Sequence, residues 1–210
     1  MITRCCLALA FLSCINAQMY SLGRCNRKVE TVENFDPSSY AGKWYEYSRA
    51  FLIFEALGKC VTATYTLRDD GKIDVLNEMQ RFGRTQSAQA IAVADSDEDL
   101  QAGKLRVFFN TTVRFPFGGP YWVLATDYDS YSVVYSCTST AIGKFHNAWI
   151  LTRDQVPSDD IIAEANNVLK ARKIRISMRK TPQDCTDGED GGDGDGDGDG
   201  NEENTETDNE

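Results

Sequence analysis

Histidine, long apolar segments and glycine-rich phosphate loops are scarce or missing in this 210-residue sequence. The one histidine, His146, stands in the polar turn 143–147, and no Ser-His-Asp or Cys-His arrangement can be assembled around it with any specificity. No glycine loop of the kind that cradles a phosphate is present. These absences exclude the common catalytic chemistries, and the sequence predicts a protein that is not an enzyme.

Lysine and arginine are missing from residues 187–210. This segment contains twelve Asp and Glu, out of 32 in the chain, and the formal net charge is -10. Subtracting the twelve from 32 leaves 20 acidic against 22 basic residues in 1–186. That part of the chain is therefore nearly neutral, and its counts give no basic patch of the kind that nucleic acid requires. We expect no nucleic-acid partner.

The same segment, 187–210, consists largely of alternating Gly and Asp and has no apolar residue to bury. This composition predicts a disordered acidic tail. Residues 195–206 fit the calcium-loop pattern D-x-D-x-D-G-x5-E. A calcium hand needs a helix on each side of its loop, and neither flank here is suited to one. We expect loose cation binding and no defined metal site.

The first 17 residues have the pattern of a secretory signal peptide. Arg4 provides the positive start, residues 5–12 the short apolar run, and Ala17 is the expected last residue before cleavage. The run is shorter than the roughly 20 apolar residues that span a bilayer. The acidic C-terminal segment also lacks the hydrophobic tail of a lipid-anchor signal. The sequence predicts a secreted, extracellular protein.

Cysteine usage agrees with export. Removal of residues 1–17 leaves four of the seven cysteines: Cys25, Cys60, Cys137 and Cys185. Four cysteines allow three pairings, and their spacing does not choose among them. Zinc is the rival interpretation, but no two of the four lie within twenty residues of each other. Two structural disulfides in an oxidising compartment are therefore expected.

Short strand-like runs separated by turn signals dominate the middle of the chain. The turn 69–72, Asp-Asp-Gly-Lys, and the turn 127–130 are the clearest links between them. Eight runs at regular spacing predict a closed barrel or a sandwich. The runs are 44–48, 61–67, 73–78, 85–94, 104–110, 121–126, 131–137 and 148–153. One helix follows, because Pro157 to Asp160 form a helix start and the apolar residues of 161–169 recur at helical spacing.

Three short motifs carry a resemblance to a known family. Gly42-Lys43-Trp44 follows Asn34-Phe35-Asp36, then Thr126-Asp127-Tyr128 follows strand 121–126, and Arg153 follows Trp149-Ile150-Leu151-Thr152. In this order and on these strands they resemble the three motifs of the lipocalin family. Residues 120–137 resemble its apolipoprotein D and Lazarillo group most. The resemblance covers roughly residues 25–185.

The resemblance implies an all-β fold, an eight-stranded antiparallel up-and-down barrel with one C-terminal α-helix packed outside, formed by residues 18–186. It implies that Trp44 lies across the barrel floor beneath the Arg153 side chain, so both are structural. The structural motif residues it implies are Gly42, Trp44, Thr126, Asp127, Tyr128 and Arg153. It also selects the disulfides Cys25–Cys137 and Cys60–Cys185.

Strand parity predicts which side chains face the barrel interior. The resemblance adds that Tyr65, Asn77, Tyr121 and Trp149 line the pocket. The alternative is that large side chains fill a small core, because eight-stranded barrels do either. The predicted ligand-binding residues are Glu46, Tyr65, Asn77, Met79, Tyr121, Tyr135 and Trp149.

The expected function is that of a secreted carrier of a small hydrophobic ligand, such as a fatty acid, sterol, retinoid or bilin, linked to lipid transport and protection against oxidative stress. No cofactor is required, although a bilin or retinoid could be bound. A pigment protein that holds a bilin or carotenoid is the alternative, and a scavenger of oxidised lipids is a third hypothesis. These three differ in ligand and not in fold.

Two surface features complete the predictions. Phe51, Leu52, Ile53 and Phe54 form an apolar loop after the first barrel strand, which is either a membrane or lipoprotein contact or an inward-folded lid. Asn110-Thr111-Thr112 is the only N-glycosylation acceptor triplet in the sequence.

Overall fold

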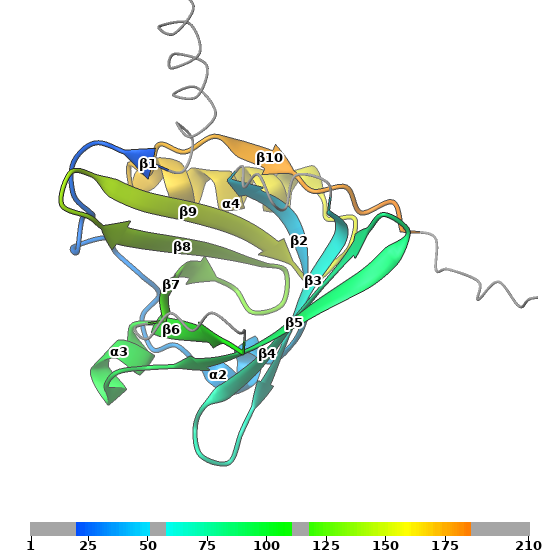
Figure 1. Cartoon of the computed structure of the whole chain (residues 1–210), viewed down its shortest axis with the longest axis horizontal. Coiled ribbons are helices and arrows are strands. Elements are labelled where there is room, and N and C mark those ends of the chain that lie inside the picture. Colours follow the sequence, from blue (N-terminus) through cyan, green and yellow to red (C-terminus); the bar gives the residue numbers. More distant parts are fainter. Residues whose placement is uncertain (1–19, 51–57, 111–117, 186–210) are drawn as a thin grey trace, which may run out of the picture.

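The computed structural model describes residues 20–50, 58–110 and 118–185, and its core is a closed antiparallel barrel (Figure 1). Each of eight consecutive strands pairs with the next, and the last pairs back with the first through Tyr45↔Thr152 and Arg49↔Trp149. The barrel strands are β2 (Gly42–Ala50), β3 (Lys59–Leu67), β4 (Ile73–Arg81), β5 (Arg84–Val93), β6 (Lys104–Phe109), β7 (Gly119–Thr126), β8 (Tyr131–Ser139) and β9 (Lys144–Thr152). The predicted eight-stranded barrel is confirmed.

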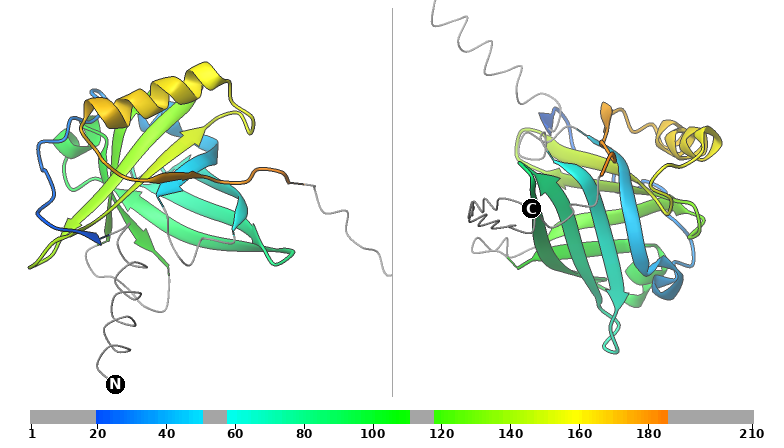
Figure 2. Two further views of the ribbon diagram at one scale, coloured as in Figure 1. Left: turned by 90° about the horizontal axis from the view of Figure 1, so that it is seen from above. Right: turned by 90° about the vertical axis from the view of Figure 1, so that its right-hand side faces the viewer.

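Five short or peripheral elements complete the described chain. Strand β1 (Tyr20–Ser21) pairs with β9, and strand β10 (Met178–Lys180) pairs with β2. Helices α2 (Pro37–Tyr40) and α3 (Asp97–Gln101) are short, whereas α4 (Asp159–Ala171) lies along the outside of the barrel (Figure 2). None of the helices in the described segments is long and apolar enough to cross a membrane.

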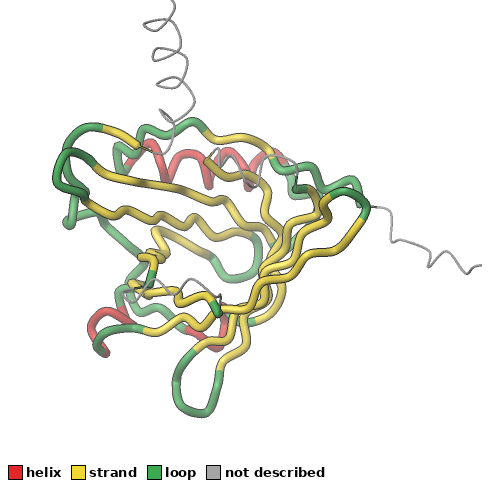
Figure 3. The backbone as a smooth tube through the Cα atoms, viewed as in Figure 1, coloured by secondary structure: helices red, strands yellow, loops and turns green. Residues whose placement is uncertain are grey.

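Tight turns fix the register of the strands. In the β3–β4 turn, Gly71 has φ +76°, and the Arg68 N–H donates to the Lys72 carbonyl. The β4–β5 turn has only two residues, Phe82 and Gly83, both with positive φ. Two central residues with positive φ match the right-handed twist of a hairpin. Strands are consequently the commonest secondary structure of the described backbone (Figure 3).

Two apolar cores lie on opposite faces of the barrel wall. The inner core is built around Trp44, Tyr65 and Val123. The outer core lies between β7, β8 and α4, where Ala165 and Leu169 of the helix are buried. Strands β8 and β9 are therefore apolar on both faces. This double burial becomes important when side chains are assigned to the interior.

Two disulfides tie the chain ends of the domain to the wall. Cys25 bonds Cys137 and Cys60 bonds Cys185, as the resemblance implied. The predicted signal peptide 1–17, the loop 51–57 and the tail 187–210 lie outside the described residues, and the predictions made for them stand untested.

Candidate ligand site in the barrel interior

Trp44 closes one end of the barrel. Its side chain is 0% exposed, and the Arg153 guanidinium carbon lies 3.8 Å from its ring centroid. Arg153 donates to the carbonyls of Ser39, Ala41, Lys43 and Tyr128 at 2.9–3.0 Å. A cation so held stacks on the indole and fixes the floor. The predicted structural roles of both residues agree with this geometry.

Gly42 and the 126–128 motif shape the same end. Gly42 has φ +97°, and a Cβ there would come within 3.2 Å of the Arg153 Nη1 atom. Asp127 Oδ1 accepts from the N–H groups of Ser130 and Tyr131, while Thr126 Oγ1 donates to the Tyr131 carbonyl. These contacts form the β7–β8 turn, so the motif residues build the closed end and leave the cavity to other side chains.

A chain of four hydroxyl groups lies directly above the floor. The Tyr65 hydroxyl is 2.7 Å from that of Tyr121, which is 2.9 Å from that of Tyr40, which is 2.9 Å from Ser132 Oγ. Burial raises the pKa of Tyr40 to about 12 and the pKa values of Tyr65 and Tyr121 well above 10. The chain is therefore neutral at physiological pH. Four hydroxyl hydrogens serve three contacts, so one hydrogen is left for a further acceptor.

The wall above the hydroxyl chain carries most of the predicted pocket residues. Directly paired residues of neighbouring strands share a face. Asn77 pairs with Ala63 of the inner core, Met79 lies two residues further along the same face, and Trp149 packs against that core. Tyr121 is packed against it as well. The structure brings Tyr65, Asn77, Met79, Tyr121 and Trp149 to one inner surface, and their contact with a ligand remains a prediction.

Toward the other end the interior is open. Phe109 pairs with the buried Ala90 on the inner face, yet it is 47% exposed. Ala88 on the same face is exposed as well, and Asn77 and Met79 are partly exposed. Among the described residues, side chains therefore pack most closely at the Trp44 end. This gradient favours a pocket over the alternative in which large side chains fill a small core, and that choice remains a prediction.

Glu46 lies on the inner face as predicted, but its carboxylate is already engaged. Arg49 Nη1 donates to Glu46 Oε1, and Thr181 Oγ1 donates to the same atom. Burial raises the pKa of Glu46, and the charge of Arg49 opposes that rise. The positive charge of Arg49 thus compensates the negative charge of Glu46 at this position of the barrel wall. Sequence reasoning missed Arg49, because a register shift between Glu46 and Ser48 in β2 turns Arg49 inward.

The C-terminal residues 181–185, here termed the C-terminal strap, close the wall beside this pair. Strands β2 and β3 are paired only from Gly42 to Tyr45, and beyond that point they separate. Gln183 Nε2 bridges the gap by donating to the carbonyls of Glu46 and Val61, both at 2.9 Å. The Cys60 N–H donates to the Pro182 carbonyl. No local sequence signal could have found these contacts, which join residues more than a hundred positions apart.

The prediction that Tyr135 faces the interior is wrong. Tyr135 pairs with Ala148 and belongs to the outer core, with its hydroxyl 3.3 Å from His146 Nδ1. Its neighbours Val133 and Val134 are both fully buried, one on each face. Alternation cannot assign a face when helix α4 covers the outside, and the inward residue is Val134.

The single histidine of the sequence, His146, lies away from the barrel interior. His146 is buried on the outer face between Tyr135 and Ser21, and burial lowers its pKa, as does the nearby charge of Lys144. Within residues 20–50, 58–110 and 118–185, no group of three His, Cys, Asp or Glu could hold a metal ion.

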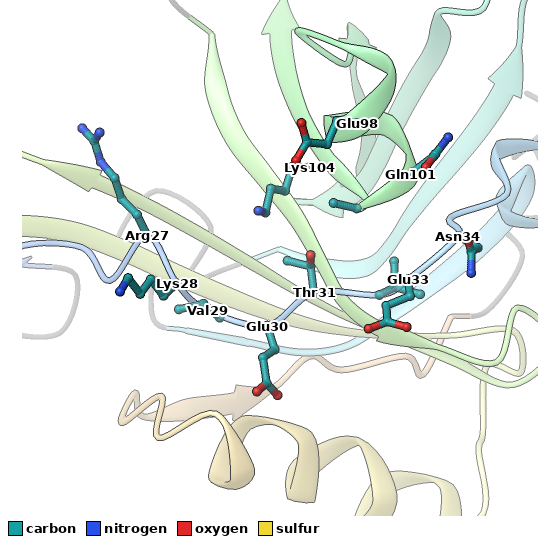
Figure 4. A pocket seen from close by; sticks show the side chains of 12 residues that line it. Arg27, Lys28, Val29, Glu30, Thr31, Glu33, Asn34, Glu98, Gln101 and Lys104 are labelled. Carbon is teal, nitrogen blue, oxygen red and sulfur yellow. The ribbon is translucent and has the colours of Figure 1, made fainter.

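Two hollows lie outside the barrel and differ in character from its interior. One, of about 550 Å³, lies between the N-terminal segment 27–34 and α3, where Glu30, Glu98 and Lys104 give it a mixed polar lining (Figure 4). The other, of about 300 Å³, lies on the outer face of β3 to β6 beside Asn110. Neither is lined by the predicted pocket residues.

Comparison with known proteins decides the family. Residues 35–182 match the family model described as a lipocalin-like domain. Apolipoprotein D of Macaca fascicularis is 37% identical over 169 residues, which cover 80% of this chain and 86% of that protein. The Lazarillo protein of Schistocerca americana is 32% identical and covers 84% of this chain and 82% of its own length. The chain belongs to the lipocalin family.

A solved structure agrees with this assignment. Insecticyanin from the tobacco hornworm Manduca sexta superimposes on this lipocalin with a TM-score of 0.67 at 28% identity, covering 79% of this chain and 89% of that one. The family consists of ligand-binding proteins and not of enzymes, in agreement with the sequence prediction. The lipocalin motifs of the sequence accordingly form the floor of the barrel. Ligand specificity would depend on the side chains of the wall above it.

Proposed function

We propose that this lipocalin is a secreted carrier that holds one small hydrophobic ligand in the open part of its barrel. The observation that carries the proposal is the inner wall, which is apolar and partly exposed between the hydroxyl chain and the open end. Some apolar side chains, such as Phe109, face inward and stay exposed to water. A bound ligand would remove their apolar surface from water, which is favourable. Tyr65, Asn77, Met79, Tyr121 and Trp149 are the proposed contacts.

The wall favours an apolar ligand with few polar groups. Burying about 400 Å² of apolar ligand surface at about 25 cal/mol per Å² contributes about 10 kcal/mol. Part of this offsets the entropy lost on binding, and micromolar affinity needs about 8 kcal/mol. A fatty acid, sterol or retinoid has enough surface. Glu46 contributes little attraction, because Arg49 compensates its charge.

Tryptophan fluorescence tests the proposal, because the three tryptophans occupy different places. Trp149 is on the inner wall, Trp44 forms the floor, and Trp122 lies on the outer face with Lys104 Nζ 5.8 Å from its ring centroid. Titration with retinol or arachidonic acid should quench the emission and saturate near one ligand per protein. Trp149→Ala should remove much of the quench and weaken binding by about 1–3 kcal/mol.

Trp122→Phe is the matched control, and it should retain both the quench and the affinity. If Trp149→Ala bound every apolar ligand as tightly as wild type, with the full quench, the interior site would be rejected. Independently of these variants, mass spectrometry of an organic extract from natively purified protein would identify the natural ligand class.

A pigment-binding role is the second candidate, in which a bilin or carotenoid occupies the same cavity. The similarity of the fold to insecticyanin favours testing it. Visible absorbance of the natively purified protein separates the two roles, because a colourless protein that binds retinol or arachidonic acid supports the lipid carrier.

The open rim is the proposed contact with a membrane or lipoprotein surface. Phe82 at the β4–β5 turn is 76% exposed and Ile142 at the β8–β9 turn is 79% exposed, and both turns are at the open end. Phe51, Leu52, Ile53 and Phe54 follow the last residue of β2 in the sequence and lie outside the described residues. Exposed apolar tips are typical of lipid contacts.

Liposome flotation tests this contact. Changing Phe82 and Ile142 to Ser should reduce flotation, and changing Phe51, Ile53 and Phe54 to Ser should reduce it further. Val156→Ser is the control, because Val156 is 87% exposed at the closed end. Undiminished flotation of the rim variants would reject the membrane role.

Export and modification are proposed from the sequence and supported by the two disulfides. Signal cleavage after Ala17 should leave Gln18 as the mature N-terminus, which N-terminal sequencing can determine. Asn110 is exposed at the end of β6, where an N-glycan could be attached. Treatment with an N-glycosidase should lower the mass of the secreted protein if that site is occupied.

A further inference from the structure

A continuous run of positive charge follows the outside of the barrel from the end of α4 to β10. Residues 170–183 contain six Lys or Arg and no Asp or Glu. The exposed members of this run on the outer side, here termed the basic strip, are Lys170, Lys173, Arg175 and Lys180, whereas Arg179 pairs with Arg49 and shares its inner face. Figure 2 shows the segment after α4 crossing the outer surface toward β2. The basic strip therefore presents several charges along one surface path.

Packing explains why these charges point outward. Ile174 and Ile176 alternate with Lys173 and Arg175 and pack against the outer core, as does Met178, while Lys180 Nζ lies 5.1 Å from the centroid of the Tyr47 ring. Arg172, which is only partly exposed, is held by the carbonyls of Glu30 and Leu124. The apolar half of the segment anchors it, and the basic half is left at the surface.

The four charges of the basic strip are not paired with carboxylates of the described residues. Within the described segments, no ion pair involves Lys170, Lys173 or Arg175. β10 pairs with β2 on one side only in the described sheet. Positive charge on an edge strand discourages edge-to-edge aggregation, but that role needs few charges and does not require four along the path.

The strongly acidic segment of the same chain begins beside this surface. Residues 187–210 carry twelve Asp and Glu and no Lys or Arg. They follow Cys185, which is bonded to Cys60, so their starting point is fixed at the barrel wall. At about 3.3 Å per residue, an extended segment of this length reaches roughly 80 Å, whereas the basic strip spans at most roughly 36 Å. The segment is long enough to turn back along the strip.

We propose that the acidic segment 187–210 binds the basic strip of its own chain. Each exposed ion pair contributes about 0–1 kcal/mol and is screened by salt. Several such pairs act together because the covalent connection keeps the local concentration of the acidic segment high. Bound in this way, the segment shields the basic strip from other polyanions and leaves the barrel interior untouched.

Zero-length carbodiimide cross-linking of the full chain tests this proposal. The reagent joins carboxylates to neighbouring lysines, and peptide mapping of the monomer identifies each pair. Links from residues 187–210 should concentrate on Lys170, Lys173 and Lys180. Lys43 and Lys72 are the reference lysines, because both are exposed at the closed end of the barrel, away from the basic strip.

A charge-reversal pair separates binding to the strip from general attraction. K173E/R175E should lower the yield of links to Lys170 and Lys180 about fivefold, which corresponds to the loss of about 0.5 kcal/mol at each position. K43E/K72E changes the net charge equally and should leave these links unchanged. Raising the salt concentration to about 1 M, where the Debye length is about 3 Å, should abolish them.

Retinol titration of both variants shows whether the barrel remains folded. Links spread over all exposed lysines, or equal losses in the two variants, would overturn the proposal. Links that occur only in the dimer band would show that the basic strip is occupied by a second copy, which also overturns binding in cis.

Discussion

The hydroxyl chain above the floor makes a quantitative prediction for Tyr121→Phe. Among the described residues, the Tyr121 hydroxyl is the only hydrogen-bond partner of the Tyr65 hydroxyl, whereas Tyr40 also contacts Ser132. Removing the Tyr121 oxygen leaves the Tyr65 hydroxyl buried without a partner and Tyr40 with one partner in place of two. Only a single oxygen atom is deleted, and the packing volume of the ring is kept.

The two losses have different sizes. A buried hydroxyl without a partner costs about 1–3 kcal/mol, and the lost bond to Tyr40 costs about 1 kcal/mol. We expect Tyr121→Phe to lower the free energy of unfolding by about 3 kcal/mol. Tyr65→Phe should cost only about 1 kcal/mol, because Tyr121 keeps its contact with Tyr40. In the double variant no hydroxyl is orphaned, so Y65F/Y121F should be more stable than Y121F by about 1 kcal/mol.

Urea unfolding of the ligand-free protein measures these differences. With a slope of about 2 kcal/mol/M, Tyr121→Phe should move the midpoint down by about 1.5 M, and adding Tyr65→Phe should move it back up by about 0.5 M. The sign of the second step is decisive. If the two substitutions added, so that Y65F/Y121F were the least stable variant, the chain of hydroxyl contacts would be refuted.

Further predictions concern the floor, the single histidine, the tyrosines and the acidic segment. Trp44→Ala should cost about 3–5 kcal/mol in urea unfolding because it opens a cavity beneath Arg153, and a loss below about 1 kcal/mol would contradict its role as the floor. The pKa of His146 is lowered from 6.5 by burial, so the unfolded chain binds a proton first. Wild-type stability should therefore fall as the pH drops through 6.5, and His146→Gln should lack that part of the decrease. The raised tyrosine pKa values mean that the unfolded chain loses its protons first, so stability should decline above pH 10, less steeply in Tyr65→Phe. Deleting residues 187–210 should change the melting temperature by less than about 2 °C, because exposed ion pairs contribute little, whereas a shift of several degrees would show that the segment packs against the fold.

The predictions that succeeded rest on local patterns. Alternation and turn residues located the eight barrel strands, because apolar and polar residues alternate in a strand that has one buried and one solvent-exposed face. The place of Trp44 at the floor came from the family resemblance, which the motif around Gly42 and Trp44 carries. The disulfides needed the family resemblance, because four cysteines alone leave three pairings open.

The predictions that failed depend on contacts that are distant in sequence. Tyr135 was assigned to the wrong face because α4 covers β8 and removes the difference between its two sides. Arg49 was missed because the bulge after Glu46 changes the parity of β2. Thr181 and Gln183 reach Glu46 across more than 130 residues. Such partners become visible only in three dimensions.

The C-terminal strap has a consequence for biosynthesis. The gap between β2 and β3 is bridged by Gln183, and the same segment is bonded through Cys185 to Cys60 near the start of β3. During synthesis the ribosome adds these residues after all eight barrel strands. A nascent chain can therefore pair its strands but cannot seal its wall until the strap has emerged and its cysteine has been oxidised. For a carrier that works as proposed, we therefore expect stable ligand binding only after the polypeptide is essentially complete and the Cys60–Cys185 bond has formed.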